Sequence, residues 1–223
     1  MLQTIEDKFQ PMFSSIQIHT GIAEGKTATL FTVPENGNNT QLTTGTAAQY
    51  QMLDYHTNMK QFGTLNDQVL IIPGFKIWAD VTDRRILEDL FINSWPLFQL
   101  FKGGGNEELF RAPLYEMVRF ANGSASSFGV LDTTVKGQKW NSLLMDKDYY
   151  KLPEGKDARG VNMQRAIEIG RNTNFKAVIT FRKAVTFYKT GLDYGAMAAD
   201  AAYTTPFHLF CSLQNTELKV QER

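Results

Sequence analysis

The sequence predicts an all-β protein, and three observations support this fold class. Residues 75–81, 161–169 and 174–185 alternate apolar and polar side chains with a period of two, which places one face of a strand against a core. The chain contains 16 Phe and 8 Tyr, residues that favour strands. The segments that connect these stretches are rich in Thr, Asn and Gly, which are common in turns. The 223 residues suit one large β domain or two small ones.

Charge and hydropathy exclude several classes of protein. The 23 basic and 23 acidic residues balance, so we expect no phosphate-driven binding to nucleic acid. The longest aliphatic run, residues 69–72, is far shorter than the roughly 20 residues that cross a bilayer. Residues 1–13 lack a basic start followed by an apolar stretch, so we expect no secretory signal and synthesis in a cytoplasm. Cys211, the one cysteine, excludes an internal disulfide and is expected to be a buried thiol.

The first elements are a strand and a loop. Residues Lys26–Val33 alternate and are β-branched, and the turn-forming residues 34–39 follow them. Residues 46–61 leave helix and irregular structure open, because a helical spacing of apolar residues competes with a high Thr and Asn content.

A long strand comes next. Residues Gln68–Val81 should place Phe75, Ile77 and Val81 on one face. Pro73 and the glycine after it interrupt this strand, and a central strand accepts them only at a bend or bulge.

Residues 82–93 carry the clearest helical signal in the chain. Thr82 can cap the helix, and Asp83 falls in its first turn. The spacing of four apolar residues gives the helix one buried face: Ile86, Leu87, Leu90 and Phe91.

The sequence pattern predicts further strands in the second half of the chain. We expect them at Pro96–Phe101, Leu109–Val118, Gly129–Val135, Val161–Ile169, Asn174–Val185 and, as one or two strands, Phe207–Val220. The period-two signal is strongest at residues 174–185, where Phe175, Ile179 and Phe181 should point into the core. Residues 140–152 leave helix and irregular structure open, and residues 153–160 and 191–205 read as exposed connections.

One motif resembles a phosphate-binding loop. Residues Gly21–Thr27 read G-I-A-E-G-K-T, with three residues between the glycines where the phosphate-loop pattern has four. Lys26 also opens a β-branched strand instead of a helix, so no helix N-terminus is available to hold phosphate. We therefore predict no nucleotide binding.

Other candidate catalytic groups have simpler interpretations. His19, His56 and His208 are dispersed along the chain, and none has a metal-site partner nearby in sequence, so we interpret each as a surface or hydrogen-bonded core residue. We interpret the carboxylates at positions 107, 108, 146 and 148 as solvated surface charges. The serines at positions 124, 126 and 127 lack the Gly-x-Ser-x-Gly motif of a hydrolase nucleophile. We interpret the glycosylation sequons at Asn38 and Asn122 as chance matches. We predict no catalytic, cofactor-binding or metal-binding residue, and no cofactor.

Two apolar features are left with alternatives. Gly103–Gly105 can hold an anion, but between strand-like segments it favours a hairpin turn. The aromatic-rich residues 91–110 can be core or an intersubunit surface.

A resemblance to a known family joins several of these segments. The order of several segments resembles that in jelly-roll coat proteins of tailless, membrane-containing phages. These segments are residues 63–65, the strand to Val81, the helix, residues 97–118 with Ala112-Pro113-Leu114, residues Asn174–Phe181 and the closing residues 209–221. The resemblance covers Gly63 to the end of the chain. It implies a jelly-roll β-sandwich over residues 1–223, single or compact double, with a helical insertion near residues 82–93 and with residues 1–25 as a candidate N-terminal arm.

The resemblance also implies a function. The chain is expected to be a structural virion protein of a bacteriophage, a self-assembling capsid protein without catalytic activity, with a homotrimer as the favoured unit. Its expected partners are copies of itself, with other virion proteins and an internal membrane as further candidates, and no nucleic acid. The alternative is a β-sandwich module that binds a carbohydrate or a receptor, using Trp78, Trp95 or Trp140 as stacking platforms.

Overall fold

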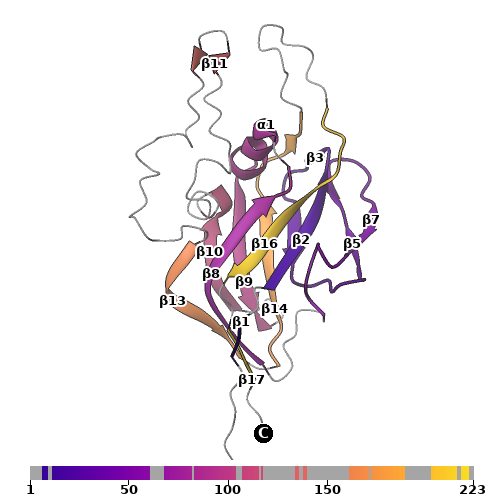
Figure 1. Cartoon of the computed structure of the whole chain (residues 1–223). Helices are drawn as coiled ribbons and strands as arrows, with labels where there is room; N and C mark the ends of the chain where they lie inside the picture. Colours follow the sequence, from indigo (N-terminus) through magenta and orange to yellow (C-terminus); the bar gives the residue numbers. More distant parts are fainter. Residues whose placement is uncertain are drawn as a thin grey trace, which may run out of the picture.

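In the residues that the structure describes, the fold is mostly β, as expected, with several antiparallel sheets and one short α-helix. It is seen in a computed structural model of the chain (Figure 1). The structure describes residues 7–9, 12–60, 68–81, 83–103, 107–115, 117, 134–135, 138–139, 161–170, 172–188, 202–214 and 217–220.

The larger sheet contains nine strands within the described residues. Its order is β1-β17-β8-β16-β2-β3-β15, with β13 also beside β8 and β6 also beside β2. All its pairs are antiparallel except β2 with β6. The strands are β1 (Asp7–Phe9), β2 (Met12–His19), β3 (Gly21–Ile22), β6 (Leu42–Thr43), β8 (Gln68–Ala79), β13 (Val161–Ile169), β15 (Val185–Thr186), β16 (Phe207–Gln214) and β17 (Glu217–Val220).

The smaller sheet has four antiparallel strands in the order β10-β9-β14-β4. They are β4 (Thr27–Leu30), β9 (Pro96–Lys102), β10 (Glu107–Pro113) and β14 (Phe175–Phe181). Two short pairs lie apart from both sheets: β5 (Asn38–Thr40) with β7 (Gln49–Gln51), and β11 (Thr134–Val135) with β12 (Gln138–Lys139).

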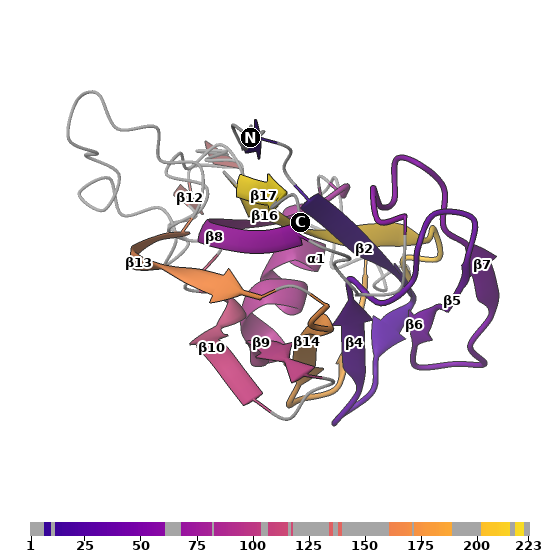
Figure 2. The ribbon, with the colours of Figure 1, turned by 90° about the horizontal axis from the view of Figure 1, so that it is seen from below.

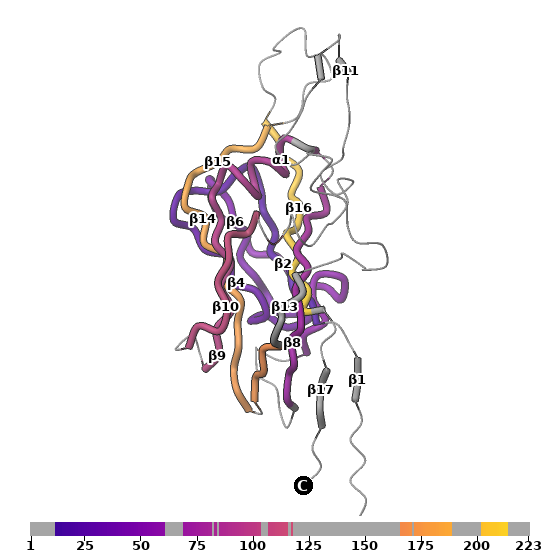
Figure 3. The backbone as a smooth tube through the Cα atoms, turned by 90° about the vertical axis from the view of Figure 1, so that its left-hand side faces the viewer, coloured from indigo at the N-terminus to yellow at the C-terminus, as the bar shows by residue number. Residues whose placement is uncertain are grey.

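The two main sheets lie face to face and share one core (Figures 2 and 3). Along β14, Phe175, Ile179 and Phe181 are all buried together with Ala177, and the alternate residues are half-buried, which confirms the predicted face. Across the layers, the ring of Phe75 on β8 lies 5.4 Å from that of Phe98 on β9. The alternation in the sequence thus supplies one wall of a continuous apolar layer.

Strand β8 accommodates Pro73 as the sequence requires. On one side, β17 pairs with residues 68–71 and β16 with residues 74–79, so Pro73 falls between two partners. On the other side, the register with β13 shifts between Asn162 and Ile167, opposite the same residue. A proline has no N–H to donate to a ladder, and this irregularity places it where none is needed.

The helix lies where it was predicted. It comprises α1 (Arg84–Glu88) and a following π-helical turn, η1 (Asp89–Asn93). Ile86, Leu87, Leu90 and Phe91 are buried, as the spacing indicated. The N-cap is Asp83, whose Oδ1 accepts from the Arg85 N–H at 3.0 Å, so Asp83 precedes the first turn instead of lying in it.

Three expected strands have different ends. β4 stops at Leu30, because Phe31 has a left-handed backbone with φ of 65°. β10 begins at Glu107 and stops at Pro113, after which residues 114 and 115 are helical. The segment 174–185 is not one strand: β14 stops at Phe181, and β15 pairs with β3 in the other sheet.

Other expectations have mixed outcomes. Residues 46–61 contain the short strand β7 and turns, with no helix, and residues 12–22, to which the sequence analysis assigned no strand, form β2 and β3. Strand β13 has the predicted bounds, and the closing segment is two strands, β16 and β17. The expectations for residues 63–65, 122–127, 129–133, 140–160 and 191–201 lie outside the described residues. No helix in the described part of the chain is long and apolar enough to cross a membrane.

Candidate functional site

The motif at residues Gly21–Thr27 forms β3, a tight turn and the start of β4. Its glycines have structural explanations. A Cβ on Gly21 would lie 2.4 Å from the Val185 carbonyl oxygen, and Gly25 has φ of 73° in the turn. The Gly25 N–H donates to the Phe181 carbonyl at 2.9 Å, so the turn is fixed to β14. No helix begins here, in agreement with the geometry that argued against a phosphate loop.

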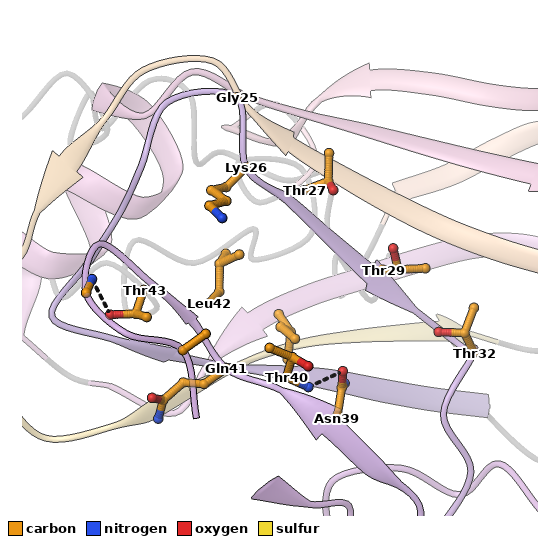
Figure 4. A pocket seen from close by; sticks show the side chains of 13 residues that line it. Gly25, Lys26, Thr27, Thr29, Thr32, Asn39, Thr40, Gln41, Leu42 and Thr43 are labelled. Atoms are coloured by element: carbon orange, nitrogen blue, oxygen red, sulfur yellow. Dashed lines mark hydrogen bonds between the residues drawn. The ribbon is translucent and has the colours of Figure 1, made fainter. Parts of the chain in front are cut away.

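The same motif borders a pocket of about 380 Å³. Figure 4 shows Thr27 and Thr29 of β4, and Thr32 just after it, along one side and the segment 39–43 along the other, with Lys26 at one end. Thirteen residues line it: Ile16, Gly25, Lys26, Thr27, Thr29, Thr32, Asn39, Thr40, Gln41, Leu42, Thr43, Gly45 and Ala47.

The chemistry of this pocket is hydroxyl-rich and singly cationic. Within the described part of the chain, the side chains of Lys26, Thr27, Thr29, Thr32 and Thr40 form no hydrogen bond. The hydroxyl of Thr43 and the amide of Gln41, by contrast, are already engaged with neighbours. One ammonium and four unengaged hydroxyls can therefore face a ligand that carries hydroxyls and one negative charge.

A second cluster lies over the outer face of the larger sheet, near β16. The three histidines are dispersed in the sequence, but the fold brings two of them together. The rings of His56 and His208 stack with centroids 4.2 Å apart, although 151 residues separate them in the chain. His19 lies elsewhere and pairs its Nε2 with the Thr204 carbonyl at 2.7 Å. The turn at residues 53–57 brings His56 onto β16.

A backbone hydrogen bond defines the tautomer of neutral His56. The Leu53 N–H donates to His56 Nδ1 at 3.1 Å, so a neutral His56 carries its proton on Nε2. That Nε2 is buried without a partner in the described residues. Burial, with His208 alongside, lowers the pKa of His56. His56 is therefore a hydrogen-bonded core residue, which agrees with one of its two predicted interpretations.

His208 joins the pair to a carboxylate. Its Nδ1 lies 3.1 Å from Asp80 Oδ2, and its backbone N–H donates to Asp80 Oδ1 at 2.6 Å. Burial works against ionisation of Asp80, but these two bonds outweigh it and lower the pKa of that carboxyl. Tyr50 lies at the edge of the cluster, where burial raises its pKa to about 12 while its hydroxyl accepts from the Gln17 N–H.

An aromatic row continues from this cluster across β16 to β8. Phe210 lies 6.0 Å from His208 and stacks on Trp78 at 5.1 Å, with an interplanar angle of 4°. The Lys76 ammonium lies 5.1 Å from the Trp78 ring centre. Trp78 is half-buried and engaged on both sides, so it is a poor stacking platform.

Trp95 is the exposed tryptophan of the described residues, at 60% exposure. Lys183 Nζ lies 4.2 Å from its ring centre. Of the three tryptophans considered as platforms, Trp95 alone has this accessibility among the described ones, since Trp140 lies outside them.

The remaining candidates are structural or lie outside the described residues. Glu107 and Glu108 of the exposed strand β10 form ion pairs with Lys102 and Arg111, respectively. This agrees with their interpretation as solvated surface charges. Gly103 has φ of 65° at the end of β9, as a hairpin turn requires, and Asn38 is exposed on β5. Cys211 is buried. In the part of the chain that the structure describes, no three His, Cys, Asp or Glu side chains form a metal-binding group. Asn122, Ser124, Ser126, Ser127, Asp146 and Asp148 fall outside that part.

Comparison with known proteins supplies no relative for this chain. No family model matches it, and neither does a curated protein or a solved structure.

Proposed function

We propose that this chain is a single jelly roll and that it builds a virus shell by self-assembly. The observation that carries the proposal is the order of the eight principal strands: β2, β4, β8, β9, β10, β13, β14 and β16. The first pairs with the eighth, the second with the seventh, the third with the sixth, and the fourth with the fifth. This nested pairing, in sheets β2-β16-β8-β13 and β4-β14-β9-β10, matches the winding expected of a jelly roll, a fold common among viral coat proteins, and so supports the proposal.

Two further properties favour a structural role over a catalytic one. The inner faces of both sheets are filled with large apolar side chains such as Phe75, Phe98 and Phe181, which makes a rigid body. The zero net charge removes a barrier to packing many copies side by side. Recurrence of the jelly roll in lectins means that the fold alone does not define the function.

The remaining parts of the proposal come from the resemblance to phage coat proteins. The location is the virion, after synthesis in the host cytoplasm, and the unit of assembly is a homotrimer. The partners are further copies, other virion proteins and an internal membrane. Contacts between copies are expected to bury about 1,200 Å² or more in total.

Light scattering and negative-stain microscopy of the purified chain test the proposal. We expect trimers or larger closed assemblies that grow with concentration. A chain that stays monomeric at millimolar concentration contradicts the coat-protein function.

A binding module is the second candidate function, and the pocket beside Lys26 favours it. Its unengaged hydroxyls and single ammonium suit an acidic sugar, with the ammonium on the carboxylate and the threonines on sugar hydroxyls. Titration with galacturonate, followed by nuclear magnetic resonance, should shift resonances of residues 26–32 and 39–43. Lys26→Gln should weaken this binding about two- to fivefold and leave galactose binding unchanged.

The matched control for that titration is Lys176→Gln, on β14 and outside the pocket. Equal shifts with inorganic phosphate would assign the site to anions in general. No shift with any of these compounds would eliminate the pocket as a saccharide site.

A further inference from the structure

The exposed large apolar side chains of the described residues fall into two patches. They are Leu53 at 36%, Tyr55 at 60% and Trp95 at 60% exposure. Leu53 and Tyr55 flank the exposed Asp54, and we call these three residues the tyrosine patch. Trp95 lies beside the exposed Lys183, which follows the exposed Arg182, and we call these three the tryptophan patch. One patch thus combines apolar surface with an acid, and the other combines it with bases.

The tryptophan patch is rigidly mounted. The backbone N–H groups of Arg182 and Lys183 both donate to the Ser94 carbonyl at 3.0 Å. Ser94 is fully buried, and its hydroxyl donates to the Leu90 carbonyl at 2.7 Å. The Lys183 ammonium over the indole then orients an exposed ring. An aromatic side chain held in this way loses little entropy when a partner covers it.

The backbone at Trp95 does not favour a tryptophan. Its φ of 47° is in the left-handed region, where a residue with a side chain is strained and glycine or asparagine is preferred. The ring is mostly exposed, so core packing does not account for it. An interface contact does account for a large aromatic residue at this position.

The tyrosine patch is mounted as firmly on the other sheet. The Tyr55 ring contacts His56 at 4.1 Å between centroids, and His56 stacks on His208 of β16. The N–H groups of His56 and Thr57 donate to the Leu53 carbonyl at 2.9 and 3.2 Å. These bonds hold the turn that presents Asp54 and Tyr55 outward.

We propose that the tyrosine patch of one copy binds the tryptophan patch of the next. This inference rests on the proposed self-assembly and names the surfaces that carry it. The charges are complementary, with Asp54 facing Arg182 and Lys183, and each side contributes an ordered aromatic ring. The patches differ and belong to different sheets, since His56 contacts β16 whereas Trp95 leads into β9 (Figure 3). The contact is therefore head-to-tail, the type that produces rings and shells.

Charge reversal tests the proposal, with association measured by sedimentation of the full chain. Asp54→Lys alone and the pair Arg182→Glu with Lys183→Glu alone should each raise the dissociation constant at least about tenfold. The single chain that carries all three substitutions should associate again, because every head-to-tail contact then joins opposite charges, in a ring of three as in any other ring. Trp95→Ala should weaken association similarly, both in the unaltered chain and in the chain with the three charge reversals.

Controls separate this inference from the proposed function. Glu168→Lys and Lys176→Glu reverse charges on β13 and β14, away from both patches, and should associate like the unaltered chain. Thermal unfolding of each variant checks that it is folded. If the unaltered chain does not associate, the proposed self-assembly fails. If it associates and the separate charge reversals change nothing, or the chain with all three substitutions does not associate again, the coat-protein proposal stands and these patches are not its interface.

Discussion

Phe181 shows how one residue links the sequence pattern to the packing. It ends β14, its side chain is fully buried, and its backbone is hydrogen-bonded to two consecutive residues of the β3–β4 turn. Its N–H donates to the Lys26 carbonyl at 2.9 Å, and its carbonyl accepts from Gly25. The same residue therefore fills the core and positions the wall of the Lys26 pocket.

Phe181→Ala should lower the free energy of unfolding by about 3–5 kcal/mol, because it leaves a cavity in a dense core. Urea unfolding followed by circular dichroism measures the loss. Thr180→Ala, on the opposite face of the same strand, is the control and should cost less than about 1 kcal/mol. A loss for Phe181→Ala as small as that of the control would contradict the assignment of faces.

Cys211 gives a second test at the scale of one residue. It is fully buried on β16, and burial raises the pKa of its thiol well above the ordinary range. We expect Ellman's reagent to leave the folded chain unmodified at pH 8 and to modify one thiol per chain in urea, since the thiolate is the reactive form. Rapid modification of the folded chain at the same pH would show that the core around β16 opens readily.

The turn at residues 53–57 contacts the larger sheet through two stacked histidines, His56 of the turn and His208 of β16. Tyr50, Tyr55 and His208 surround His56 with their rings, and the carboxylates of Asp54 and Asp80 also act on it. Neutral His56 accepts from the Leu53 N–H, and a protonated ring cannot. Protonation therefore opposes the geometry that presents the tyrosine patch.

Stability should fall as the pH drops below about 6.5, the ordinary pKa of histidine. The pKa of His56 is lower in the folded chain than in the unfolded chain, so the unfolded chain binds more protons in this range. Urea unfolding at pH 7.5, 6.0 and 5.0 measures the effect. His56→Asn keeps an acceptor for Leu53 and should flatten the dependence, and His19→Asn, at a histidine outside this cluster, is the control. An unchanged slope in His56→Asn would assign the effect to other groups.

At the scale of the whole molecule, both sheets contribute to one apolar core. The core joins residues of β2, β8 and β16 to residues of β4, β9 and β14, and the helix adds Ile86 and Leu90. No described segment has a core of its own. The prediction of one domain follows from this shared layer.

The chain should therefore unfold in one cooperative transition. Far-ultraviolet circular dichroism and tryptophan fluorescence should give coincident urea curves, because Trp78 and Trp95 report on different sheets. Two separated transitions would divide the chain into independent units. The far-ultraviolet spectrum itself should be that of a β protein.

Much of the fold can be predicted from the local pattern of apolar and polar residues. The strands around residues 75–81, 161–169 and 175–181 and the helix at residues 84–93 follow from periodicity. Strand β2 carries a similar signal, with Ile16 and Ile18 buried on either side of Gln17, and this signal was missed. The ends of β4 and β14 were not accessible, because they depend on the backbone of Phe31 and on the Ser94 carbonyl, which belongs to another segment.

Composition and short-range pattern are enough to predict the fold class, the faces of the best strands, the helix and the balance of charge, because each depends on composition or on neighbours a few residues apart. The sites, by contrast, depend on tertiary contacts. His56 meets His208, Lys26 faces residues 39–43, and Trp95 gains Lys183, each across a long stretch of chain. Such contacts follow from the order in which strands pair, and strand order is set by the packing of the whole core, which no short window of sequence contains.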